Sequence, residues 1–192
     1  MNSLIDKFLK TIPSVTTDPW QASKFRDWQK QTNKLKGNTG ENYIKFVLET
    51  EGFSIDSVGG SEDHDLIDTN TGLKIEVKTS FAAKVSGKPL INSDGFIFQH
   101  IGLHKDWDWL AFVGINHENP AYRHVRRGWR EETEDVVVRF VSREKFEEWV
   151  REGLFKPQQG GESGGNDDWW STSTFFKDTN YLADYTKYLP AS

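Results

Sequence analysis

The order of apolar and polar positions along the chain predicts a mixture of helices and strands. Residues 38–51 have the helical period, with Ile44 and Leu48 on one stripe and Gly52 after the last turn. Residues 108–115 are almost continuously apolar, which is typical of a strand buried on both faces of a sheet. We therefore expect an α/β fold with a mixed central β-sheet flanked by helices. The other expected helices span residues 3–12, 18–35 and 142–152, and the other expected strands span residues 53–58, 66–67, 73–78, 96–101 and 135–141, with 96–101 in the central sheet.

The most informative pattern begins at Asp65. Residues 73–78 alternate between apolar and charged side chains, as in a strand with one buried face, so Glu76 and Lys78 project from the same side. Residues 70–72 read Asn-Thr-Gly and favour a tight turn back to the short apolar strand before them. If the two arms pair antiparallel, Asp65 comes level with Glu76 and Lys78.

Carboxylates at this spacing suit a divalent cation that prefers oxygen ligands. Asp65 and Glu76 are the expected metal ligands, with the carbonyl of Val77 as a third ligand and water completing the set. The expected cation is Mg²⁺, with Mn²⁺ as a substitute, and Lys78 would orient or deprotonate the attacking water. This chemistry predicts hydrolysis of a phosphodiester. The competing explanation is an ordinary solvated strand face with alternating charges.

The spacing of Asp65, ten intervening residues and then Glu-Val-Lys at 76–78 resembles the PD-(D/E)xK nuclease superfamily. His64 stands where the Pro of that name would be. The resemblance implies a restriction-endonuclease-like core, which begins with the order helix, strand, strand, strand, and an Mg²⁺-dependent reaction on DNA. It also implies that Glu41 assists the metal site and that Gln99 supports the active site.

Several of these assignments have rivals in the sequence. Glu41 lies three residues after Asn38, so the two also fit a capping box at the start of the helix 38–51. Gln99 could instead satisfy backbone groups, and His100 is its neighbour and rival. The rival acids for the metal are Asp56, Asp63 and Asp68, of which the last lies toward the turn and away from Glu76.

One segment, residues 122–130, is strongly basic and contains interleaved aromatic residues. Arginine pairs bidentately with phosphate and with guanine edges, so this segment is expected to contact DNA. The competing explanation is that it balances the acidic residues 131–135 across a hairpin. A loop is expected over residues 79–94, and its Lys84 is a further candidate for contact with DNA. The expected DNA contacts are Arg123, Arg126, Arg127, Arg130 and Lys84.

The 192 residues suit a single domain, and the net charge of −5 argues against binding nucleic acid through bulk positive charge. The absence of cysteine excludes disulfides, zinc-thiolate sites and thiol nucleophiles. No apolar run is long enough for a membrane span and no secretory signal is evident, so a cytoplasmic protein is expected. The expected organisation is an N-terminal helical arm over 1–36, a catalytic core over 37–155, and a Gly-rich loop with an aromatic C-terminal tail over 156–192.

The function predicted from the sequence is an Mg²⁺-dependent DNA endonuclease, of the sequence-specific restriction or homing type. A junction-resolving or nicking nuclease of the same fold is the second hypothesis. Outside enzymes, a non-catalytic DNA-binding module or a protein-interaction module built on the tail aromatics would also fit. Cutting both strands of double-stranded DNA is most simply done by a homodimer with one site per subunit.

Overall fold

The computed structural model describes residues 19–58, 63–81, 96–115, 117, 135–153, 156–157 and 168–172. Its helical elements are the 3-10 helix η1 (Pro19–Ala22) and the α-helices α2 (Arg26–Gln29), α3 (Asn33–Thr50) and α4 (Arg143–Arg151). Its strands are β1 (Ile55–Ser57), β2 (Leu66–Asp68), β3 (Lys74–Phe81), β4 (Ile97–Gly102), β5 (Trp109–Ile115), β6 (Val136–Ser142), β7 (Lys156–Pro157) and β8 (Asp168–Thr172). Within these described ranges, no helix has the length and apolar character needed to cross a membrane.

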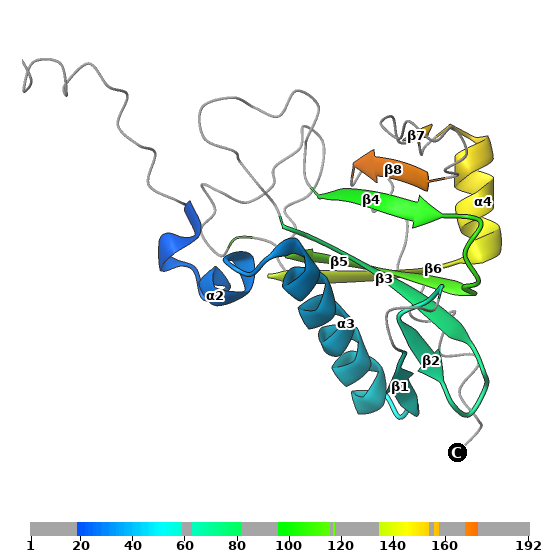
Figure 1. Ribbon diagram of the computed structural model, residues 1–192, viewed down its shortest axis with the longest axis horizontal. Helices are drawn as coiled ribbons and strands as arrows, with labels where there is room; N and C mark the ends of the chain where they lie inside the picture. The colour runs from blue at the N-terminus through cyan, green and yellow to red at the C-terminus, as the bar shows by residue number, and fades with distance from the viewer. Residues whose placement is uncertain are drawn as a thin grey trace, which may run out of the picture.

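The strands form two sheets. A five-stranded sheet has the order β1-β2-β3-β5-β6, and a three-stranded sheet has the order β4-β8-β7 (Figure 1). In the five-stranded sheet β3 and β5 are parallel, whereas the other neighbouring pairs are antiparallel. The predicted α/β fold with a mixed sheet is therefore confirmed, and α3 followed by β1, β2 and β3 has the expected order helix, strand, strand, strand.

Apolar side chains pack on both faces of the five-stranded sheet. All seven residues of β5 are buried, which confirms the prediction of a strand covered on both faces. Val113 joins a core that contains Ile44 of α3, whereas Leu110 and Phe112 join a second core that contains Phe146 of α4. Figure 1 shows α3 on one side of β3, β5 and β6, and β4 with α4 on the other side.

The N-terminal helices differ from the prediction. The expected helix 18–35 is interrupted, because Ser23 and Thr32 each bind a nearby backbone N–H group with their hydroxyl oxygen. Thr32 caps α3 by accepting the N–H of Leu35 at 3.4 Å, so α3 begins well before residue 38. The predicted capping box of Asn38 and Glu41 is therefore wrong, and both residues lie inside α3.

The segment 96–101 was expected in the central sheet, and this prediction is wrong. Strand β4 pairs antiparallel with β8, while Phe96, Phe98 and Ile101 fill the second core. The register of β4 shifts between Phe98 and Ile101, where His100 has a φ of 57°. Strands β7 and β8 lie in the region for which only a Gly-rich loop and a tail were expected. Strand β3 also continues to Phe81, into the predicted loop.

Candidate functional site

The predicted hairpin is present and brings Asp65 beside β3. Leu66 pairs with Ile75, so Asp65 lies opposite Glu76. The N–H of Asp65 donates to the carbonyl of Ile75 at 3.0 Å, and Asp65 Oδ2 accepts the N–H of Val77 at 2.7 Å. The side chain of Asp65 therefore accepts a backbone N–H of β3 at the point where backbone pairing with β2 ends. This bond fixes the position of its carboxylate next to Glu76.

The turn of the hairpin depends on another acid, Asp68. Its buried carboxylate accepts the N–H of Asn70 at 3.1 Å and the hydroxyl of Thr71 at 2.7 Å. Gly72 has a φ of 76°, a conformation that glycine adopts without strain. Asp68 thus stabilises the turn, in agreement with the prediction that it lies away from the site.

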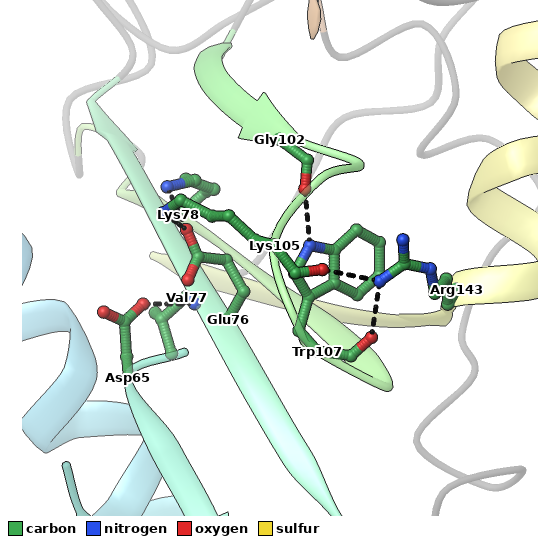
Figure 2. A network of polar contacts seen from close by, with 8 residues as sticks. All are labelled: Asp65, Glu76, Val77, Lys78, Gly102, Lys105, Trp107 and Arg143. Carbon is green, nitrogen blue, oxygen red and sulfur yellow. Dashed lines mark hydrogen bonds and ion pairs between the residues drawn. The ribbon is translucent and has the colours of Figure 1, made fainter. Parts of the chain in front are cut away.

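Glu76 is almost fully buried, with a side chain that is 2 % exposed. Its Oε1 accepts hydrogen bonds from two ammonium groups, Lys78 Nζ at 2.5 Å and Lys105 Nζ at 3.0 Å (Figure 2). The prediction that one face of this strand is solvated is therefore wrong, because β3 is covered on the side of Glu76 as well. A simple surface alternation of charges does not describe this strand.

Glu41 of α3 is influenced by the charges of the same carboxylates. The helix approaches β3 so closely at Gly40 that a Cβ atom there would lie 1.8 Å from Thr79 Oγ1. Burial, and then the charges of Asp65 and Glu76, raise the pKa of Glu41 from 4.5 to about 7. Glu41 is therefore close enough to Asp65 and Glu76 for their charges to affect it; its role at a metal site stays a prediction, and it is not a helix cap.

The pKa of Asp65 is raised as well, from 3.8 to about 6. Burial is the main cause and the charge of Glu76 is the second, while the N–H of Val77 and the charges of Lys78 and Lys105 lower the pKa. Asp65 and Glu41 thus hold protons at a pH where exposed carboxyl groups are ionised. Such strongly shifted groups are typical of functional sites.

Lys105 belongs to this cluster and was not predicted. It lies in the connection between β4 and β5, far from the motif in sequence, and no spacing rule points to it. The connection is anchored by Arg143 of α4, whose Nη1 donates to the carbonyls of Lys105 at 2.7 Å and Trp107 at 3.3 Å. The indole N–H of buried Trp107 donates to the carbonyl of Gly102 at 2.9 Å (Figure 2).

The other predicted site residues divide into two groups. Gln99 is exposed in the irregular part of β4, and so is its rival His100; the rival acids Asp56 and Asp63 are also exposed. The predicted DNA contacts lie outside the described residues: these are Lys84, Arg123, Arg126, Arg127 and Arg130.

The oxygen atoms around Asp65 and Glu76 determine whether the cluster could hold a divalent cation. The hydrogen bonds among the described residues use Oδ2 of Asp65 and Oε1 of Glu76. The carbonyl of Val77 faces the same edge of β3 as its N–H, which contacts Asp65. In this part of the chain no three acidic or histidine side chains form a ready metal cage. Two carboxylates completed by a carbonyl and water would suit Mg²⁺, which retains several waters in proteins.

No protein-family model, no curated protein and no solved structure matches this chain.

Proposed function

We propose that this protein is an Mg²⁺-dependent DNA endonuclease with a restriction-endonuclease-like core. The observation that carries the proposal is the hydrogen bond from the N–H of Val77 to Asp65 Oδ2 at 2.7 Å. It holds one carboxylate beside the buried pair of Glu76 and Lys78, whose atoms are 2.5 Å apart. An Asp and a Glu-x-Lys sequence thereby converge at one edge of β3.

The energetics of the cluster support a functional rather than a structural role. Burying a carboxylate is unfavourable unless opposite charges and hydrogen bonds compensate, and apolar residues of similar size are often at least as stable. Here burial, and after it the charges of neighbouring carboxylates, raise the pKa values of Glu41 and Asp65. A strand that served only the core would be more stable with an apolar residue at Glu76. The charges are therefore best explained by a ligand that needs them.

Each residue has a distinct role in the proposed reaction. Asp65 and Glu76 would hold the cation with the carbonyl of Val77, and a bound Mg²⁺ would polarise the phosphate and acidify a water molecule. Lys78 is 18 % exposed at its side chain, so its ammonium group can face a substrate, orient the attacking water and stabilise negative charge. Glu41 would assist by holding water in the outer shell of the site.

The arrangement of elements supports the same class of enzyme. Helix α3 and strands β1 to β3 follow the order with which the core of this superfamily begins, and β3 carries the acidic and basic residues. The proposed substrate is double-stranded DNA, cut by a homodimer of the restriction or homing type. Junction cleavage and nicking are the second hypothesis within the same fold.

Cleavage of DNA tests the proposal directly. Supercoiled plasmid and phage DNA are incubated with the protein in Mg²⁺, Mn²⁺ or EDTA, for wild type, Lys78→Ala and Lys74→Ala. Lys74 is a matched control because it lies on the same strand and pairs with exposed Asp106 rather than with Glu76. We expect discrete fragments that require the metal, disappear in Lys78→Ala and persist in Lys74→Ala.

Two other outcomes would contradict the proposal. Equal cleavage by wild type and Lys78→Ala would show that the activity does not come from this site. Binding of DNA in EDTA without cleavage of duplex, modified DNA or four-way junctions would favour a non-catalytic DNA-binding module. The positions of the fragment ends would also give the recognised sequence.

A further inference from the structure

Lys105 occupies the site in a way that the motif does not explain. Its Nζ lies 3.0 Å from Glu76 Oε1, the same oxygen that Lys78 contacts. One lysine would already neutralise this buried carboxylate. The side chain of Lys105 is 29 % exposed, so the second ammonium group lies between the buried acid and solvent. That is the position from which a cation can also contact a bound anion.

The backbone around Lys105 is held in place by a dedicated set of contacts. Arg143 donates to three carbonyls of this connection, those of Leu103, Lys105 and Trp107. The guanidinium group also lies 5.1 Å from the centre of the Trp107 ring, which is buried in the second core. Figure 2 shows Lys105 extending from this anchored turn toward the carboxylate of Glu76. The backbone position of Lys105 is therefore fixed by the fold.

The charges of the cluster indicate which ligand this arrangement would accept. Once a bound cation has displaced the protons of Asp65 and Glu41, the three carboxylates exceed the two ammonium groups by one negative charge. A divalent cation would leave one net positive charge, which matches the single negative charge of a phosphodiester. Without Lys105 the loaded site would be neutral, and its attraction for a phosphate would be correspondingly weaker.

We propose that Lys105 is a second cationic contact to the DNA phosphate at this site. The inference rests on the proposed nuclease function and deepens it, because it assigns substrate binding to a residue outside the Asp and Glu-x-Lys motif. When DNA binds, the ammonium group of Lys105 donates to a phosphate oxygen while Lys78 serves the attacking water. Lys105 would thus contribute to binding as well as to the reaction.

The test compares Lys105→Gln, Lys105→Arg and Lys74→Gln. Lys74 provides a close match, because its side chain is 31 % exposed against 29 % for Lys105 and it pairs with Asp106 on the same turn. Cleavage is measured on the plasmid as kcat and KM, and binding on a labelled duplex that carries the mapped cleavage site. Binding is measured in Mg²⁺ over a range of NaCl concentrations, using each variant in a Lys78→Ala background to prevent cleavage.

We expect Lys105→Gln to lower kcat/KM by about 10²-fold, as for loss of one donor to a developing negative charge. The slope of log K against log salt should fall by about 0.9, the effect of one lost phosphate contact. Lys105→Arg should keep the slope, and Lys74→Gln should keep both values. Thermal unfolding shows whether each variant is folded. If Lys105→Gln is not folded, the test rests on Lys105→Arg, which must keep the wild-type salt slope.

The two proposals fail in different ways. If wild type cuts DNA and Lys105→Gln has the wild-type rate and salt slope, the role of Lys105 is overturned while the nuclease stands. If Lys105→Gln loses stability alone, with cleavage per folded molecule unchanged, Lys105 only neutralises Glu76. If wild type neither cuts nor binds DNA, both proposals fall.

Discussion

The substitution Glu41→Gln should change how stability depends on pH. The folded protein raises the pKa of Glu41 from 4.5 to about 7, through burial and the charges of Asp65 and Glu76. Between these pH values the folded chain binds a proton that the unfolded chain has released, so the free energy of unfolding falls as pH rises. The free energy of unfolding stops falling once the pH is well above 7. Gln keeps the shape of the side chain and removes the charge, so it removes this loss.

The magnitude follows from the size of the pKa change. A rise from 4.5 to about 7 corresponds to at most about 3.5 kcal/mol, since one pKa unit is about 1.4 kcal/mol. Glu41 is partly exposed, and solvent screening reduces the effect to about 1 kcal/mol. Glu41→Gln should therefore exceed wild type in the free energy of unfolding by about that amount at pH 8 and match it at pH 4.

Urea unfolding between pH 4 and pH 8 in EDTA measures this difference. Glu49→Gln is the control, because Glu49 lies on the same helix in an exposed pair with Lys45, at 3.7 Å. That control should follow wild type at every pH. If Glu41→Gln and wild type have the same pH profile, Glu41 does not lie in a repulsive carboxylate cluster, and its proposed place in the site is wrong.

Three further predictions concern the hairpin, the helix that covers it and the assembly. Gly40→Ala should destabilise the protein, because the new Cβ would overlap Thr79, whereas Gly37→Ala should stabilise α3 by about 0.5–1 kcal/mol. Thermal unfolding distinguishes the two variants. Equal shifts in their melting temperatures would contradict the close approach of α3 to β3 at Gly40. Asp68→Ala should lower the free energy of unfolding in urea by about 1–3 kcal/mol, because the donors of Asn70 and Thr71 in the turn lose their acceptor. DNA cleavage per folded molecule should not change. Loss of cleavage would instead place Asp68 among the acids of the site. Sedimentation should show a homodimer at micromolar concentration, and a monomer would count against two-strand cleavage by one assembly.

The local part of the site could be predicted from the sequence because all of its determinants lie close together. The alternation in residues 73–78 and the turn at 70–72 act within one hairpin, and the register of Leu66 with Ile75 follows from them. Asp65, Glu76 and Lys78 therefore converge as predicted. The strand β5 was also predicted correctly, since a continuous apolar run is typical of a strand that is buried on both faces.

Other predictions were wrong because the sequence was compatible with two structures. Thr32 and Asn38 are both residues that cap helices, and the structure uses Thr32, so the stretch between them is helical. The apolar pattern of β4 correctly indicated a strand, but it contains no information on the partner. That partner is β8, about 70 residues later in the chain, and the pairing removes β4 from the central sheet.

The charge balance of the site depends on contacts that no local pattern reveals. Lys105 meets Glu76 across 29 residues, and Arg143 holds the backbone of Lys105 across 38 more. Trp107, whose carbonyl Arg143 also contacts, lies in the second core. The motif thus specifies the groups of the proposed site, whereas the contacts of Arg143 in α4 with the connection between β4 and β5 position the second positive charge beside Glu76. Changes in those contacts should therefore affect DNA binding and cleavage even where the Asp and Glu-x-Lys residues are intact.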